Sequence, residues 1–106
     1  MTYRMFLDDE RDPPKDGQDW LVFRSSGHAI GFMMIHGLPD FISFDHDLGG
    51  LDTAMVVVNY IQEELVKAST KRPFDFYIHS QNPIGKYNIE VAWSAFDRFA
   101  KENGYE

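Results

Sequence analysis

The sequence predicts an α/β fold: a small three-layer structure with a mostly parallel sheet of about four strands and helices on both faces. Two observations support this prediction. Short apolar runs recur along the chain, which is typical of strands buried in a parallel sheet. Longer segments with apolar residues at helical spacing separate the later runs, and right-handed crossovers would pack these helices on the sheet. We expect one domain that spans residues 1–106.

The first strand is predicted at residues 3–7, where a short apolar run ends in charged residues. The stretch that follows, residues 9–19, contains Pro13, Pro14 and Gly17 among charged side chains. Because proline and glycine interrupt regular structure, we expect this stretch to be a loop.

The second strand is predicted at residues 20–23, and a helix is expected directly after it. Ser25 or Ser26 is a suitable N-cap, the helix would run through Ile35, and Gly37 supplies a stop signal. The apolar positions at helical spacing are Ile30, Met33, Met34 and Leu38.

The third strand is predicted at residues 41–44, and the Gly49-Gly50 pair then turns the chain away. Asp52 stands where a helix N-cap is expected, and this helix would run to about residue 68. Its apolar positions are Met55, Val58, Tyr60, Ile61, Leu65 and Val66.

The fourth strand is predicted at residues 74–78. Asn82 followed by Pro83 predicts the start of the last helix, because asparagine caps well and proline at the first helical position lacks only an unused donor. The apolar positions of this helix are Ile89, Trp93, Phe96 and Ala100.

Composition and charge exclude several classes of protein. A formal net charge of −7 argues against general binding to the nucleic-acid backbone, which needs clustered Lys and Arg side chains. The chain has no cysteine, which excludes thiol chemistry and is compatible with a reducing compartment. Acidic residues from Asp8 onward leave no room for a signal-peptide core, and no apolar run approaches the roughly 20 residues of a membrane helix. We therefore expect a cytoplasmic protein with no membrane contact.

The residues after the first predicted strand are the first candidates for a site, because an open α/β sheet binds ligands at the carboxyl ends of its strands. Asp8 and Asp9 are suited to a hard cation such as Mg²⁺ or Mn²⁺, although they could equally form a solvated turn. Arg11 could hold a phosphate through two hydrogen bonds or neutralise the two acids.

Asp45, His46 and Asp47 follow the third predicted strand. If the strand continued through them, Asp45 and Asp47 would point the same way and His46 the other. One carboxylate could then bind the cation while the other orients a histidine or a water. The alternative is an acidic cap for the next helix.

His79 and Ser80 follow the fourth predicted strand. Together with Asn82 they offer a general acid or base, a hydroxyl donor and a helix N-terminus that favours anions. Lys86 could reach a bound phosphate, although a solvated lysine is the simpler interpretation. A histidine that ends a strand can also be purely structural.

Residues 6–11, 42–49 and 78–83 resemble, in order, the motifs of the cyclic-phosphate-processing receiver-like domain family, and the resemblance covers nearly the whole chain. This resemblance implies a trimmed response-regulator receiver fold with flavodoxin-like topology. It also implies a role in processing cyclic phosphates on nucleotides or RNA ends.

The related receiver domains imply roles for single residues. Asp8 and Asp9 are similar to the receiver's Mg²⁺-binding acidic pair, Asp45 to its phosphoacceptor and Ser80 to its hydroxyl residue. The receiver's final strand and its lysine have no counterpart, and the additional histidines point toward hydrolysis or transfer and away from signalling.

The main hypothesis is a phosphoesterase, similar to a cyclic phosphodiesterase, that uses Mg²⁺ or Mn²⁺ to process a cyclic or terminal phosphate on a nucleotide or RNA end. The metal ligands would be Asp8, Asp9 and Asp45. The catalytic residues would be His46, Asp47, His79 and Ser80. The phosphate-binding residues would be Arg11, Ser80, Asn82 and Lys86. The alternative is a non-catalytic receiver-like module that is phosphorylated at Asp45 or binds a phosphorylated ligand or partner.

Overall fold

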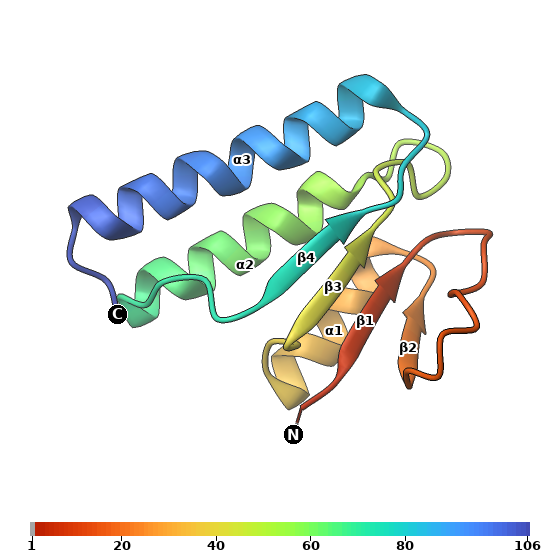
Figure 1. The fold of residues 1–106 in the computed structure, drawn as a ribbon, viewed down its shortest axis with the longest axis horizontal. Helices are drawn as coiled ribbons and strands as arrows, with labels where there is room; N and C mark the ends of the chain where they lie inside the picture. The colour runs from red at the N-terminus through yellow and green to blue at the C-terminus, as the bar shows by residue number, and fades with distance from the viewer. Residues whose placement is uncertain (1) are drawn as a thin grey trace.

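The computed structural model describes residues 2–106, and within them the chain forms four strands and three helices (Figure 1). In chain order they are β1 (Arg4–Leu7), β2 (Trp20–Phe23), α1 (Ser26–His36), β3 (Phe41–Phe44), α2 (Ala54–Ala68), β4 (Asp75–Ile78) and α3 (Pro83–Glu102). The predicted order of elements is therefore confirmed, and so is the loop between the first two strands.

The strands form one sheet in the order β2-β1-β3-β4, and all neighbouring pairs are parallel. The register aligns the last residues of three adjacent strands, because Leu7 pairs with Phe44 and Phe44 pairs with Ile78. The predicted α/β class and the parallel sheet are thus confirmed. The carboxyl ends of β1, β3 and β4 lie side by side.

All three helices pack against the same face of this sheet, so the expected arrangement with helices on both faces is wrong. Phe32 of α1 contacts Phe23, with ring centroids 5.1 Å apart, and Trp93 of α3 lies 6.5 Å from Phe44 by the same measure. Phe23 and Phe44 point to the same side as Leu7, because the register pairs all three. The molecule therefore has two layers.

The direction of the chain within the sheet explains this difference. The connections from β2 to β3 and from β3 to β4 both advance across the sheet in one direction, so right-handed crossovers place α1 and α2 on one face. Only the step from β1 to β2 runs in the opposite direction. A helix there would cover the other face, but the prolines and glycine of residues 9–19 leave this connection without one.

The second face of the sheet is therefore covered by no helix within residues 2–106. We call it the open face; it carries Arg4, Phe6, Phe41, Ser43 and Tyr77. The core lies on the other side, where alternate strand residues meet the helices. Its largest fully buried side chains include Trp93, Phe44, Met5, Leu7 and Ile42.

The predicted N-cap residue is confirmed for two of the three helices. Ser25 caps α1 by accepting from the backbone of His28, and Asn82 caps α3 with proline at its start, as predicted. The cap of α2 is Thr53, so the prediction of Asp52 in this role is wrong. The Asp52 carboxylate instead accepts from the backbone N–H and the hydroxyl of Ser26, at 2.9 and 2.5 Å. It thereby ties the start of α1 to the loop before α2.

Two residues predicted on the apolar sides of helices are exposed. Met34 is 70% exposed and Val66 is 44% exposed. In α1 the buried residues are Ser26, Ala29 and Met33, and Met34 lies one residue, or about 100°, further around the helix. None of the helices in the described chain is both long and apolar enough to cross a membrane.

Replacing Asp52 with alanine should lower the free energy of unfolding by about 1–3 kcal/mol, because the backbone and hydroxyl donors of the buried Ser26 would lose their acceptor. Urea denaturation measures this difference. Glu90→Ala, an exposed change on α3, is the control and should leave stability unchanged. Equal stability of Asp52→Ala and the parent protein would contradict a structural role for this carboxylate.

Candidate functional site

Polar residues follow β1, β3 and β4 at the aligned carboxyl end of the sheet. The backbone pairing continues one residue past the strands, since Asp45 N–H donates to Leu7 O and His79 N–H donates to Phe44 O, each at 2.9 Å. Asp8, Asp45 and His79 are consequently neighbours on three adjacent strands. By strand alternation they share the side of the open face.

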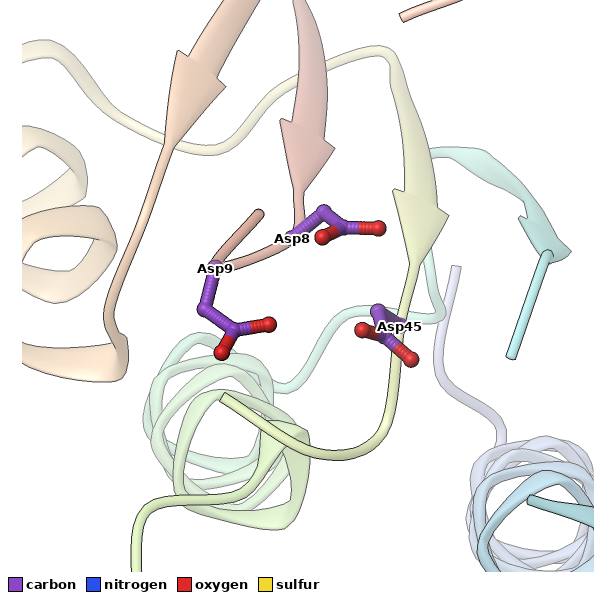
Figure 2. A group of neighbouring side chains, drawn as sticks. All are labelled: Asp8, Asp9 and Asp45. Atoms are coloured by element: carbon purple, nitrogen blue, oxygen red, sulfur yellow. The ribbon is translucent and has the colours of Figure 1, made fainter. Parts of the chain in front are cut away.

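Three carboxylates gather at this edge, and Figure 2 shows them facing a common space beyond β1 and β3. We call Asp8, Asp9 and Asp45 the acidic cluster; one oxygen from each lies within 4.8 Å of the others. Asp8 is fully buried and Asp45 is 6% exposed. Buried carboxylates this close together repel one another unless a cation or a proton compensates their charge.

Asp8 is well compensated by hydrogen-bond donors. Its Oδ1 accepts from the backbone N–H groups of Glu10 and Arg11, both at 2.8 Å. Its Oδ2 lies 3.1 Å from Arg11 Nε and 3.0 Å from His79 Nε2. Burial alone would raise the pKa of Asp8, but these hydrogen bonds and the charge of Arg11 together lower it below its usual value. Asp8 is therefore ionised at neutral pH.

Asp45 is poorly compensated. Burial raises the pKa of this carboxyl, and the negative charge of Asp8 raises it further. The charge of Arg11 opposes this shift only in part, since its Nη2 lies 3.7 Å from Asp45 Oδ1. In this structure Arg11 neutralises the acids, which is one of its two predicted roles.

The donor set fits a hard divalent cation. Carboxylate oxygens are the ligands that Mg²⁺ and Mn²⁺ prefer, and Mg²⁺ usually keeps waters and substrate oxygens in its remaining positions. The charges also fit, because the cluster has three carboxylates, the Arg11 guanidinium pairs with two of them, Asp8 and Asp45, and the pKa of Asp45 is raised. The acidic cluster could therefore hold such an ion.

His79 is held in a fixed orientation beside the acidic cluster. Its ring stacks on Phe6 with centroids 4.6 Å apart and planes 7° apart. Its Nδ1 lies 2.7 Å from the hydroxyl of Ser43 and its Nε2 3.0 Å from Asp8. An ionised Asp8 can only accept, so in the neutral ring Nε2 carries the hydrogen and Ser43 donates to Nδ1.

Ser43 is a site residue that sequence reasoning missed. It interrupts the apolar run of β3, and it is 5% exposed. A hydroxyl in such a run requires a partner, because a buried polar group is almost always hydrogen-bonded. That signal was present in the sequence, but the partner lies 36 residues away.

His46 and Asp47 are not members of the acidic cluster, although Asp47 lines the same open cleft as Asp9 and Asp45. The third strand ends at Phe44, as predicted, and does not continue through His46 and Asp47; Asp47 instead forms an isolated antiparallel bridge with Thr53. Asp47 is exposed, and its carboxylate binds His46 Nδ1 at 3.0 Å and Asn82 Nδ2 at 3.1 Å. These hydrogen bonds, the one from His46 first, lower the pKa of Asp47.

The His46 ring lies directly against Gly85 of α3, which leaves no room for a Cβ at that position. His46 therefore packs between the end of β3 and the first turn of α3. Its role in catalysis stays a prediction.

The remaining predicted phosphate ligands lie around the start of α3. Asn82 Oδ1 accepts from the backbone of Ile84 and Gly85, and the Ser80 hydroxyl accepts from the backbone N–H of Asn82 at 3.1 Å. Lys86 is exposed on α3. Asn82 and Ser80 thus shape the turn into α3, and their contact with a phosphate stays a prediction.

An open cleft of 570 Å³ lies over this edge, and its lining residues include Asp9, Glu10, Arg11, Asp45, Asp47 and Asn82. Gly49, at φ +92°, closes one side, and a Cβ there would lie 3.4 Å from Asp9 Oδ2. The glycine turn therefore lets the backbone approach the acidic cluster, leaving space for a small anion beside it.

Comparison with known families gives one match. The family described as the cyclic-phosphate processing receiver domain matches residues 3–95, a range that contains every site residue named above. No curated protein and no solved structure matches the chain.

Asp45→Asn should stabilise the metal-free protein at neutral pH. Since folding raises the pKa of Asp45, the ionised carboxylate favours the unfolded state. The gain in the free energy of unfolding should be complete at pH values above the raised pKa of Asp45 in the folded protein. It should vanish below the unfolded value of 3.8, where the carboxyl is protonated in both states. Urea denaturation across this pH range, in chelator, measures it.

The control for this change is Asp19→Asn, which neutralises an exposed carboxylate. Adding Mg²⁺ should reverse the ranking, because an ion that binds the folded state stabilises the parent protein more than the variant. Lower stability of Asp45→Asn at neutral pH without metal would show that the carboxylate is satisfied, and would contradict the charge balance described here.

Ser43→Ala should lower the free energy of unfolding by about 1 kcal/mol, the usual net value of one hydrogen bond. Ser94→Ala, an exposed change on α3, is the control. Nitrogen NMR of the imidazole should show the hydrogen of His79 on Nε2 in the neutral ring. A hydrogen on Nδ1 would reverse the proposed direction of the Asp8–His79–Ser43 contacts.

Proposed function

The chain belongs to the family of cyclic-phosphate processing receiver domains, and from this premise we propose that it hydrolyses or transfers a cyclic or terminal phosphate on a nucleotide or an RNA end. The observation that carries the proposal is the acidic cluster beside His79, at the carboxyl edge of a parallel sheet. That edge combines a cation site with a group that can carry a proton, and phosphoester hydrolysis needs both.

Asp8, Asp9 and Asp45 would hold Mg²⁺ or Mn²⁺ in this proposal. Such an ion, when bound, polarises a phosphoryl oxygen and offsets the negative charge that develops there. The incomplete compensation of Asp45 supports this assignment, because a site with unbalanced negative charge binds a cation more favourably.

Arg11 would bind the phosphate once the carboxylates have another source of positive charge. Its side chain is 45% exposed, so it can turn without disturbing the core. It also lines the cleft in which the phosphate would lie. A guanidinium suits this role, because its planar donors match two phosphate oxygens at once.

His79 would move the proton. Its Nε2 lies at the acidic cluster, and the Asp8 carboxylate would stabilise the ring when it is charged. In hydrolysis of a cyclic phosphate, water adds to phosphorus, one P–O bond breaks, and a proton must reach the leaving oxygen. His79 is favoured over His46 for this step, because His79 Nε2 lies 3.0 Å from Asp8 of the acidic cluster, whereas the His46 ring packs against Gly85 at the first turn of α3.

A second function, phosphorylation of Asp45 in a non-catalytic receiver-like module, has one observation in its favour. Asp45 directly follows β3 and lines an open cleft that also holds Arg11. A small phosphodonor with Mg²⁺ would then add the mass of one phosphoryl group to the protein, and Asp45→Asn would prevent this.

The proposed activity is tested by incubating the protein and Mg²⁺ with each of the four nucleoside 2′,3′-cyclic phosphates. Turnover should fall by about 10²- to 10⁴-fold in His79→Ala, the usual contribution of a general acid or base. It should fall at least as far in Asp45→Asn, and it should stop in chelator. Chromatography of the nucleotide products measures the rate.

The matched controls are His36→Ala and Asp19→Asn, which change exposed residues outside the site and should retain full activity. Full turnover by both site variants would refute the assignment of residues. A phosphoryl adduct on the parent protein, with no turnover of any nucleotide, would instead support the non-catalytic module.

A further inference from the structure

A second cleft lies on the open face of the sheet, below the acidic cluster. Its volume is 480 Å³, within the roughly 300–1,000 Å³ that small-molecule sites occupy. Side chains from all four strands and the loop after β1 line it. It is thus a feature of the sheet itself, formed where no helix covers the strands in the described part of the chain.

The walls of this cleft are largely aromatic, and Arg4, Arg11, Asp12 and Asp16 add charged side chains to them. Phe6, Trp20, Phe41 and Tyr77 line it, and Tyr77 is 61% exposed. The Arg4 guanidinium lies 4.5 Å from the Trp20 ring centroid and 4.3 Å from that of Phe41. Its Nε is buried and has no hydrogen-bond acceptor within residues 2–106. Arg4 thus lies over the Trp20 and Phe41 rings, and Tyr77 is the aromatic wall that is most open to a ligand.

The polar content of the open face distinguishes it from a face that packs a helix. The helix-covered side of the central strands carries Met5, Leu7, Ile42 and Phe44, all apolar. The corresponding positions on the open face include Arg4 and Ser43, and Tyr77 follows on β4. A planar ligand with both ring faces and polar edges suits this surface better than the apolar side of a helix.

The cleft is continuous with the proposed phosphate site. Arg11 lines both clefts, and His79, which touches Asp8, also lines the aromatic one. Strand alternation also indicates that the two clefts are continuous. Asp8, Asp45 and His79 each follow by two residues a side chain of the aromatic cleft, namely Phe6, Ser43 and Tyr77, on the same side of the sheet. A single ligand could therefore extend from the acidic cluster into the aromatic cleft.

We infer that this cleft holds the base of the substrate, so that the substrate is a nucleoside phosphate whose phosphate lies at the acidic cluster and whose base stacks on the aromatic wall of the cleft at Tyr77. The inference rests on the proposed function and adds to it a binding site for the base: a sugar phosphate without a base should bind poorly. Stacking on aromatic side chains is tolerant of base identity, so all four bases should bind.

Trp20 provides a direct probe, because the only other tryptophan, Trp93, is buried in the core on the opposite side of the sheet. The experiment titrates the protein with adenosine 2′,3′-cyclic phosphate, with adenosine, and with ribose 2,3-cyclic phosphate. Tryptophan fluorescence and calorimetry follow binding. The cyclic nucleotide and adenosine should quench Trp20, and ribose cyclic phosphate should bind at least about tenfold more weakly than the cyclic nucleotide, the value of one stacked base.

Tyr77→Ala should weaken binding of the cyclic nucleotide by about tenfold, because it removes an exposed wall of the cleft without affecting the core. The matched control is Tyr87→Ala, since Tyr87 is 65% exposed on α3 and should leave affinity unchanged. Equal affinity of these two variants, or of the ligands with and without a base, would overturn the inference. Either result would leave the proposed phosphate chemistry intact.

The experiment also distinguishes a failure of the proposed reaction from a failure of the base site. Quenching by adenosine with no turnover of any cyclic phosphate would support the base site and refute the proposed reaction. No response of Trp20 to any of the three ligands would overturn the inference, and a dimer that forms at high protein concentration in sedimentation would then point to the open face as a contact between two copies.

Discussion

The parallel register of β1, β3 and β4 is the constraint on which the site depends. It aligns Leu7 with Phe44 and Phe44 with Ile78, so the next residue of each strand lies in one row. Backbone hydrogen bonds past the strand ends keep Asp45 beside the last residue of β1 and His79 beside that of β3. The backbone pairing of the strands thus makes neighbours of residues that are far apart in the chain. A shift of one residue in either pair would separate the carboxylates and turn their side chains to the opposite face.

Asp8 and Asp45 differ in charge balance because they have unequal numbers of hydrogen-bond donors around them. Asp8 accepts from two backbone N–H groups, from Arg11 and from His79, and its pKa is lowered. Asp45 lies beside it with weaker support, and its pKa is raised. One guanidinium therefore serves two acids unequally. The same imbalance that makes Asp45 unfavourable in the metal-free protein would favour an added cation, so stability and ligand binding are coupled through one carboxylate.

The absence of a helix between β1 and β2 determines which surfaces are available within residues 2–106. The loop over residues 9–19 was predicted from its prolines and glycine, but its consequence for the layers was not. The handedness rule places a helix only after the strand order is known, and the sequence does not state that β2 lies at the edge and β1 inside. The uncovered face carries Phe6, Trp20 and Tyr77 below the acidic cluster, so this topology joins the two clefts.

The sequence by itself determined the features that depend on neighbouring residues: the strands and helices to within about two residues, the cap at Asn82, and the acids placed directly after strands. These follow from local periodicity, turn propensity and capping. The tertiary structure alone decided which polar residues meet. Asp52 binds Ser26 instead of capping α2, Ser43 binds His79, and Asp47 binds His46 and Asn82. Two of these contacts join residues 26 and 36 positions apart, and their partners depend on strand order and helix placement, which no local pattern encodes.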